Sequence, residues 1–156
     1  LYDGTVIPAN RTADEVEKAR RVEAFHAPYH SALTDLAARQ DDTAIIAIHR
    51  STPRLNGRSP RPWHIGILHQ FDDRLSDPLL DLLRDEDDLY VGDNEPYAGH
   101  LPGDSVDRHA LQMGRANALI ELRSDLIETP DQQIAWANRL APILTQALIQ
   151  METQDA

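Results

Sequence analysis

The sequence contains no cysteine among its 156 residues. Disulfide bonds and thiolate chemistry are therefore excluded. We expect a protein of a reducing compartment, the cytoplasm, because cross-linked extracellular domains depend on cysteine. The sequence also has no apolar stretch long enough to span a bilayer and no signal-peptide pattern, so we expect no membrane partner.

Basic residues are scarce as well, with 15 Lys and Arg against 26 Asp and Glu and a formal net charge of −11. A nucleic-acid partner is not expected, because binding phosphates requires a basic face. Docking on anionic lipids needs the same kind of face. No glycine-rich phosphate loop is present, which argues against nucleotide binding. The hydrophobic share of 41% and the length indicate one globular domain over residues 1–156.

Apolar runs and helical stripes alternate along the chain. We predict strands over 43–48, 63–69, 89–91 and 117–122, and helices over 13–39, 76–84, 105–113 and from 130 onward. This order predicts an α/β fold, a three-layer αβα sandwich with a mostly parallel or mixed sheet, of the phosphorylase/hydrolase-like type. Thr12 is the predicted N-cap of the first helix, with Glu15 completing a capping box, and Pro28 should kink or split that helix. Gly114 is a predicted C-cap, and Thr129 a predicted N-cap.

The first apolar run, residues 44–48, is typical of a strand buried on both faces, and His49 follows it. In open α/β sheets ligands bind beyond the carboxyl ends of strands, so His49 is a candidate functional residue. The alternative is a histidine that only caps the strand. The next loop carries Arg50, Arg54, Arg58 and Arg61. Arginine forks suit a carboxylate ligand, but pairing with surface Asp and Glu explains them equally.

A carboxylate, Glu121, interrupts the apolar run at 117–122. Burying it is costly unless it is paired or functional. Arg123 should point to the same side, so the alternative is a structural ion pair. The segment 92–97 is rich in hydrogen-bonding side chains, although turn chemistry alone could explain it. His26 and His30 have a spacing that can bind metal, but no third ligand is evident, and we favour a partly exposed pair.

His49 after a strand and Glu121-Leu122-Arg123 in a later strand resemble the zinc carboxypeptidase-like fold. Longer motifs resemble one branch of it, the N-formylglutamate amidohydrolase family, from about Asp3 to the last helix. The motifs are Asp3-Gly4-Thr5-Val6-Ile7-Pro8, Thr52-Pro53, Arg61-Pro62-Trp63-His64-Ile65-Gly66, Gly92-Asp93-Asn94-Glu95-Pro96-Tyr97, and Ile120-Glu121-Leu122-Arg123 with Asp125-Leu126-Ile127.

The resemblance implies that a zinc-activated water hydrolyses the amide bond of a small acidic substrate, an N-acyl amino acid such as N-formyl-glutamate. It implies that His49 is a metal ligand and that Glu121 takes and returns the proton. The side chains that it makes candidates for holding substrate carboxylates or the oxyanion are Arg61, Asn94 and Arg123. Those that would line or shape the pocket are His64, Glu95, Tyr97 and His109.

The chain departs from the family pattern in two respects. The other metal ligands of the family lie in an upstream histidine motif, and nothing before His26 can take their part, although a catalytic zinc needs three protein ligands. Arg50 also follows His49 where relatives usually carry serine. We therefore expect the C-terminal portion of a longer chain. The alternatives are a non-catalytic module that binds an acidic small molecule and a structural protein whose acidic surface meets a basic partner.

Overall fold

The computed structural model describes residues 6–99 and 101–154. Its sheet contains β1 (Ile45–Ser51), β2 (Ile65–Leu68), β3 (Val91–Asp93) and β4 (Asn117–Arg123), in the spatial order β1-β4-β2-β3. The pairs β1/β4 and β2/β3 are parallel, whereas β2 and β4 are antiparallel. The prediction of a mixed sheet is confirmed.

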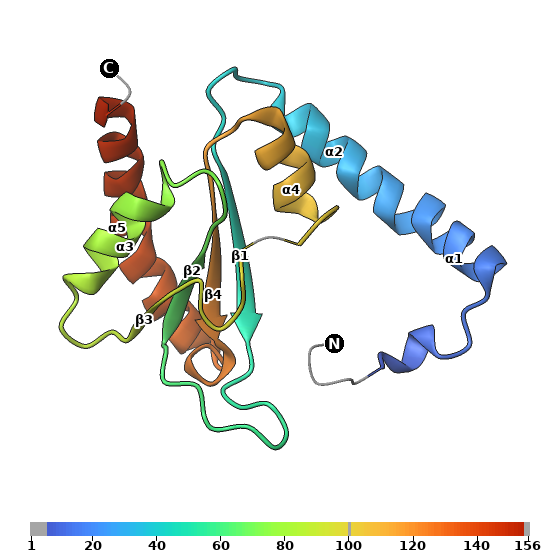
Figure 1. Ribbon diagram of the computed structural model, residues 1–156, viewed down its shortest axis with the longest axis horizontal. Coiled ribbons are helices and arrows are strands. Elements are labelled where there is room, and N and C mark those ends of the chain that lie inside the picture. The colour runs from blue at the N-terminus through green and yellow to red at the C-terminus, as the bar shows by residue number, and fades with distance from the viewer. Residues whose placement is uncertain (1–5, 100, 155–156) are drawn as a thin grey trace.

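Helices cover both faces of this sheet, which confirms the predicted three-layer sandwich (Figure 1). The helices α3 (Ser76–Arg84) and α5 (Pro130–Gln154) lie on one face. On the other face lies α4 (Ser105–His109), followed by the short 3-10 helix η3 (Leu111–Met113). Among the helices of the described residues, none combines the length and the apolar character that crossing a membrane requires.

The larger core lies between the sheet and the helices α3 and α5. Ile65, Ile67 and Ile120 point from neighbouring strands to this side, and each is 0% exposed. Leu79 and Leu83, one helical turn apart on α3, are also fully buried against them. A smaller apolar cluster on the opposite face joins Leu68 of β2 and Leu119 of β4 to α4. Because α4 is short, it covers only part of that face.

The prediction for the first strand is wrong in two respects. The strand does not end before His49 but continues to Ser51, and it is not buried on both faces. In the described sheet β1 is an edge strand paired with β4. Its residue Ile48, in register with Ile120, is 60% exposed. An apolar run alone cannot reveal whether a second strand or a helix covers it, so burial was overestimated. The third strand is also shifted toward the C-terminus, to Val91–Asp93.

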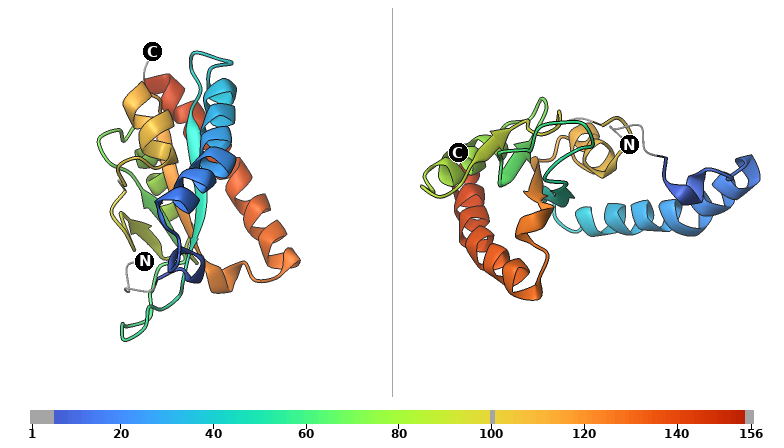
Figure 2. Two further views of the ribbon diagram at one scale, coloured as in Figure 1. Left: turned by 90° about the vertical axis from the view of Figure 1, so that its right-hand side faces the viewer. Right: turned by 90° about the horizontal axis from the view of Figure 1, so that it is seen from below.

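The N-terminal helix is interrupted, as predicted at Pro28. The chain forms α1 (Glu15–Arg21), a π-helical turn η2 (Val22–His26) and α2 (Ala27–Ala37). The N–H of Ala27 donates to the carbonyl oxygen of Val22, which widens the turn just before Pro28. A proline has no N–H, and a π turn is one way to accommodate it. The resulting rod projects beyond the sheet (Figures 1 and 2).

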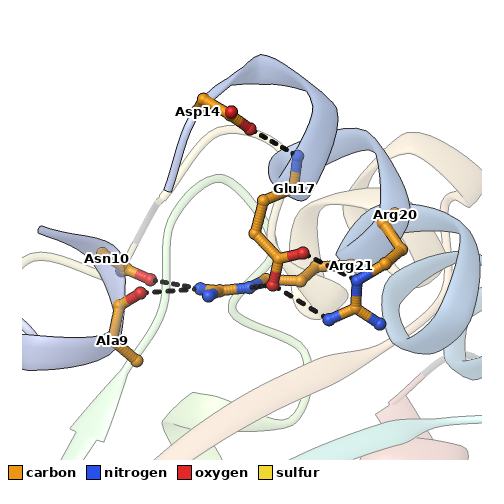
Figure 3. Close-up of polar contacts among 6 residues, drawn as sticks. All are labelled: Ala9, Asn10, Asp14, Glu17, Arg20 and Arg21. Carbon is orange, nitrogen blue, oxygen red and sulfur yellow. Dashed lines mark hydrogen bonds and ion pairs between the residues drawn. The ribbon is translucent and has the colours of Figure 1, made fainter. Parts of the chain in front are cut away.

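The start of this rod differs from the prediction. Asp14, not Thr12, is the N-cap of α1, and its carboxylate accepts a hydrogen bond of 2.8 Å from the N–H of Glu17 (Figure 3). Aspartate is at least as good an N-cap as threonine, and its position two residues later moves the helix start to Glu15. The predicted capping box between Thr12 and Glu15 is therefore wrong. At the other predicted ends, Gly114 adopts φ 65° as a C-cap and Thr129 accepts from the N–H at position 132, which confirms both.

Arg21 joins the turn at residues 8–10 to α1 through hydrogen bonds. The Glu17 carboxylate accepts hydrogen bonds from Arg20 and Arg21, and these lower the pKa of Glu17 to about 2 (Figure 3). The Arg21 guanidinium also donates to the carbonyl oxygen of Ala9 and to the side-chain oxygen of Asn10. One arginine thus joins the preceding 3-10 turn, η1 (Pro8–Asn10), to the helix.

Candidate active site

His49 and Glu121 stand in one row across the sheet. His49 of β1 is in register with Glu121 of β4, Glu121 with Gly66 of β2, and Gly66 with Gly92 of β3. Residues in register on neighbouring strands point to the same face. The imidazole and the carboxylate therefore emerge on the face that α4 covers only in part, beside two positions that carry no side chain.

The carboxylate of Glu121 is buried and incompletely paired. Its Oε1 lies 3.8 Å from Nδ1 of His49, and its side chain is 8% exposed against 55% for the imidazole. Its second oxygen, Oε2, is buried and has no hydrogen-bond partner among residues 6–99 and 101–154. Burial raises the pKa of Glu121 above its ordinary value, while the neighbouring His49 and Arg61 act in the opposite direction. A buried carboxylate with a raised pKa can take up and return a proton during a reaction.

The two glycines of the row make room for a loop. A Cβ atom on Gly66 would collide with the carbonyl oxygen of Glu95, and one on Gly92 would come within 2.8 Å of the Glu95 Cβ. The carboxyl ends of β2 and β3 point in the opposite direction from those of β1 and β4, because β2 is parallel to β3 and antiparallel to β4. The segment after β3 reaches the row only by turning back, and Asn94, at φ 52°, makes that turn.

Two hollows lie on this side of the molecule and share Tyr97 and Ala98 as walls, and the smaller one adjoins the row. The smaller, of about 200 Å³, lies directly against the imidazole and the carboxylate, and its walls are His49, Leu68, Tyr97, Ala98, Gly99, Leu101, Asp104, Leu119 and Glu121. The larger, an open groove of about 1010 Å³, runs between the arginine-rich loop and the turned-back segment, and Arg58, Arg61, Trp63, Glu95 and Tyr97 are among its walls. We call them the acyl-side pocket and the arginine groove.

Arg61 faces the groove in a fixed orientation. Its Nη2 donates to the hydroxyl oxygen of Tyr97 at 2.8 Å, its Nη1 donates to the carbonyl oxygen of Thr52 at 2.9 Å, and its guanidinium carbon lies 4.7 Å from the Tyr97 ring centroid. Arg123 also contacts the arginine-rich loop. Its guanidinium pairs with Asp125 and donates to the carbonyl oxygen of Arg61. The ion pair recorded for Arg123 is thus with Asp125 rather than with Glu121.

Two other predicted residues, Asn94 and His64, have local partners. The side-chain oxygen of Asn94 accepts from the N–H of His69 at 3.0 Å, and Nδ1 of His64 accepts from the N–H of Tyr90 at 3.1 Å. Both contacts fix the ends of strands. Direct contact of Asn94, Arg123 or His64 with a substrate stays a prediction.

His109 lies away from Glu121, in a separate hollow of about 450 Å³ between α2 and α4. Its Nε2 is 2.7 Å from Nδ1 of His30, and the ring of His26 is 4.2 Å from that of His30. Burial lowers the pKa of His109, as it does the pKa of His30. Within the described residues no group of three or more His, Cys, Asp or Glu side chains is arranged to hold a metal ion.

A model of one protein family, described as FGase, N-formylglutamate amidohydrolase, matches residues 1–128 of the 156. The chain belongs to the N-formylglutamate amidohydrolase family. The matched range includes every residue of the row and both hollows, so the family resemblance inferred from the motifs is confirmed.

Two solved structures are similar to this chain. The gene product Atu2144 from Agrobacterium tumefaciens is 33% identical, with a TM-score of 0.81, and the match covers 96% of this chain and 61% of that one. The N-formylglutamate amidohydrolase from Ralstonia eutropha JMP134 is 23% identical, with a TM-score of 0.58 and coverage of 88% and 55%, and supports the fold. The chain thus spans a little over half of each. A search of curated proteins finds no match.

For this family member, sequence patterns missed the glycine row and the leucines of the acyl-side pocket. A signal for Gly66 was present, because it interrupts the predicted strand 63–69, and glycine inside a strand often marks a close backbone approach, whereas Gly92 followed the predicted strand 89–91. Nothing in the sequence paired them with Glu121. Leu68 and Leu119 belong to the smaller apolar cluster and also line the pocket.

Proposed function

We propose that this chain is part of a zinc-dependent amidohydrolase that cleaves the amide bond of a small N-acyl amino acid such as N-formyl-glutamate. The observation that carries most weight is the buried carboxylate of Glu121 beside His49, on the wall of the acyl-side pocket, which meets the arginine groove at Tyr97 and Ala98. Membership of the family supports the reaction class.

In this proposal Glu121 is the proton carrier. The ionised carboxylate removes a proton from the water that attacks the amide carbon, and the protonated carboxyl then donates that proton to the leaving nitrogen as the carbon–nitrogen bond breaks. Burial helps, because a carboxylate with a raised pKa is a better base for water and a usable acid for an amine. This transfer leaves Glu121 ionised again, and the products, an amino acid and a carboxylic acid, then leave.

The arginine groove would hold the acidic end of the substrate. Arg61 is oriented by Tyr97 and by Thr52 before any ligand binds, so little side-chain entropy remains to be lost. Arg58 lines the same groove. A guanidinium binds a carboxylate through parallel hydrogen bonds, which favours an amino acid with a carboxylate side chain.

Zinc enters the proposal through the family, with His49 as the ligand that this chain would contribute. A catalytic zinc takes three protein ligands and an open position. The described residues include no trio of ligand side chains, so by themselves they do not fit a complete zinc site. We assign no chemical step to the metal.

The test is formate release from N-formyl-L-glutamate by the full-length protein with added zinc. We expect turnover, its loss on chelation, and a decrease of about 10²–10⁴-fold in kcat for Glu121→Gln, the usual contribution of a general acid–base group. Glu128→Gln, the same change at an exposed position seven residues along, should keep normal activity. Full activity of Glu121→Gln would contradict the assignment of Glu121, and absence of turnover in the wild type would contradict the hydrolase.

A second candidate is a non-catalytic module that binds an acidic small molecule. The observation in its favour is that the described residues complete the arginine groove but not a metal site. Metal analysis of the purified full-length protein separates the two. Stoichiometric zinc supports the hydrolase, whereas calorimetric binding of N-formyl-glutamate without zinc and without formate release supports the module.

A further inference from the structure

His69 follows β2 directly, and no step of the proposed reaction uses it. Its Nε2 lies 2.9 Å from a carboxylate oxygen of Asp93, the last residue of β3. An ionised carboxylate only accepts hydrogen bonds, so Nε2 is the ring nitrogen that carries the hydrogen. The second oxygen of Asp93 accepts from Nη2 of Arg84 on α3 at 3.1 Å. The imidazole thus ties the carboxyl ends of β2 and β3 to each other and to a helix.

This network adds little to the stability of the fold. The side chains of Arg84 and Asp93 are 51% and 45% exposed, and ion pairs exposed to that degree contribute little to the free energy of unfolding. The Nδ1 atom of His69 is buried and has no hydrogen-bond partner in the described part of the chain. Because an unpaired buried nitrogen costs free energy, stability alone does not explain a histidine at this position.

Both ends of the turned-back segment, residues 94–99, rest on the backbone of His69. At one end, the N–H of His69 donates to the side-chain oxygen of Asn94 at 3.0 Å, and the N–H of Asn94 donates to the carbonyl oxygen of Ile67 at 2.9 Å. At the other end, Gly99 lies so close that a Cβ atom on it would collide with the backbone nitrogen and the carbonyl oxygen of His69. The segment is therefore a loop that is closed at one residue.

The closed segment forms one wall of the arginine groove, which residues 95–98 line. Within it, Tyr97 accepts the hydrogen bond of 2.8 Å that orients Arg61, and its ring centroid lies 4.7 Å from the guanidinium carbon. Hydrogen bonds weaken steeply when their distance or angle departs from the ideal. The orientation of Arg61 therefore depends on how firmly the two ends of the segment are held.

We infer that His69 is a positioning residue of the arginine groove, which acts on the orientation of Arg61 through the position of Tyr97. Its imidazole holds Asp93, the residue before the turned-back segment, and its backbone closes the segment. The inference rests on the proposed function for the identity of the ligand, N-formyl-glutamate. Removing the imidazole should weaken binding of this ligand and leave the chemical step unchanged.

A double-mutant cycle tests the path from His69 to Tyr97. KM and kcat for N-formyl-glutamate are measured, with zinc, on the full-length wild type, His69→Ala, Tyr97→Phe and the double variant. His69→Ala should raise KM about fivefold or more and change kcat by less than about twofold, because only an interaction that binds the ligand is weakened. In the Tyr97→Phe background the same change should raise KM by less than about twofold, because the hydrogen bond through which it acts is already absent.

Two further variants separate positioning from a loss of packing. His69→Gln, which also offers an N–H at the end of its side chain, should recover most of the affinity. Arg139→Gln is the matched control: Arg139 donates to Glu86 at 3.0 Å and joins α5 to the turn after α3, but it lines neither hollow. It should leave KM unchanged in both backgrounds. If His69→Ala does not fold, Asp93→Ala takes its place in the cycle with the same expectation.

The outcomes separate this inference from the proposed function. Calorimetry with N-formyl-glutamate on the same variants, each combined with Glu121→Gln, measures affinity without turnover. Formate release with an unchanged KM in His69→Ala, with equal losses in both backgrounds, or with no recovery in His69→Gln overturns the inference and leaves the hydrolase intact. Coupled losses of affinity without turnover by the wild type support the positioning role and overturn the hydrolase. Absence of both binding and turnover in the wild type contradicts both.

Discussion

The two faces of the sheet are built by the same strands but differ in how their side chains are packed. Toward α3 and α5, Ile65, Ile67 and Ile120 are fully buried in continuous apolar packing. On the other face, the neighbouring positions are Gly66 and Glu121, which replace packed hydrocarbon with bare backbone and a buried carboxylate. The face toward α3 and α5 therefore stabilises the fold, and this stabilisation offsets the cost of the buried carboxylate and the glycines on the other face.

This division has a physical reason. A buried carboxyl oxygen without a partner and glycines inside strands each cost free energy. Such features persist only where the rest of the structure compensates for them, and they gather at functional sites. The four predictions below test the division, beginning with the largest effect.

Removing packing from the stabilising face should have the largest effect. Leu79 is 0% exposed between α3 and the sheet, so Leu79→Ala should lower the free energy of unfolding by about 2–5 kcal/mol. Ile134→Ala, at a 58% exposed position, should change it by less than about 0.5 kcal/mol. Urea denaturation measures both. A loss below about 1 kcal/mol in Leu79→Ala would show that this face is not the main source of stability.

Filling the glycine row should affect both stability and binding. The methyl group of Gly66→Ala would meet the Glu95 carbonyl oxygen, so the segment through Tyr97 must move. We expect a loss of about 1–3 kcal/mol and a loss of ligand affinity of about tenfold or more. The control is Gly114→Ala, where φ is 65° and an added Cβ would come within 4 Å of no other described residue except its chain neighbours. It should cost about 1 kcal/mol through backbone strain and leave affinity unchanged, and equal losses of affinity in both variants would contradict the role of the row.

How much of this division can be predicted from sequence depends on whether a feature is local. Glu121 was identifiable because a carboxylate stands out within a run of buried apolar residues. The sandwich followed from the alternation of strands and helices, and the family from motifs along the chain. The corrected helix start, at Asp14, was a choice between neighbouring caps of similar strength.

The features that sequence did not yield are those created by strand pairing. The proximity of His49 of β1 to Glu121 of β4 was implied by the family resemblance alone, because 71 positions separate them in the chain and no local pattern joins them. The edge position of β1, and with it the exposure of Ile48, depends on which strands lie beside it. The return of the segment after β3 onto the glycine row depends on the antiparallel pairing of β2 with β4.

The groove should respond to loss of a single hydroxyl group. Tyr97→Phe removes the oxygen that accepts from Arg61 at 2.8 Å, while the ring that the guanidinium covers remains. A hydrogen bond from a charged group is worth about 1.5 kcal/mol or more, so KM for N-formyl-glutamate should rise about tenfold with little change in kcat. Tyr29→Phe is the control, because it removes a hydroxyl that contacts Ser105 at 3.1 Å, in the contact between α2 and α4. A decrease in kcat alone would assign Tyr97 to the chemistry instead of to binding.

The smallest effect on stability should come from removing the charge of Glu121, a change whose effect on kcat is much larger. Because burial raises its pKa, the folded protein holds the proton to a higher pH than the unfolded chain does. The unfolded state therefore binds fewer protons between the ordinary and the raised pKa, and the free energy of unfolding falls as the pH rises through that interval. Above the raised pKa the full penalty of the buried charge is present, and below the ordinary value of 4.5 it is absent.

Glu121→Gln removes this titration while nearly keeping the shape of the side chain. The variant should be more stable than the wild type by about 0.5–1 kcal/mol at pH 8, and the difference should vanish near pH 4. Glu128→Gln, which changes an exposed carboxylate, should follow the wild type at both values. Thermal unfolding at the two pH values provides the measurement. A Glu121→Gln variant that is less stable than the wild type at pH 8 would mean that the carboxylate is a structural partner, and the contrast between the two faces would then lose its functional meaning.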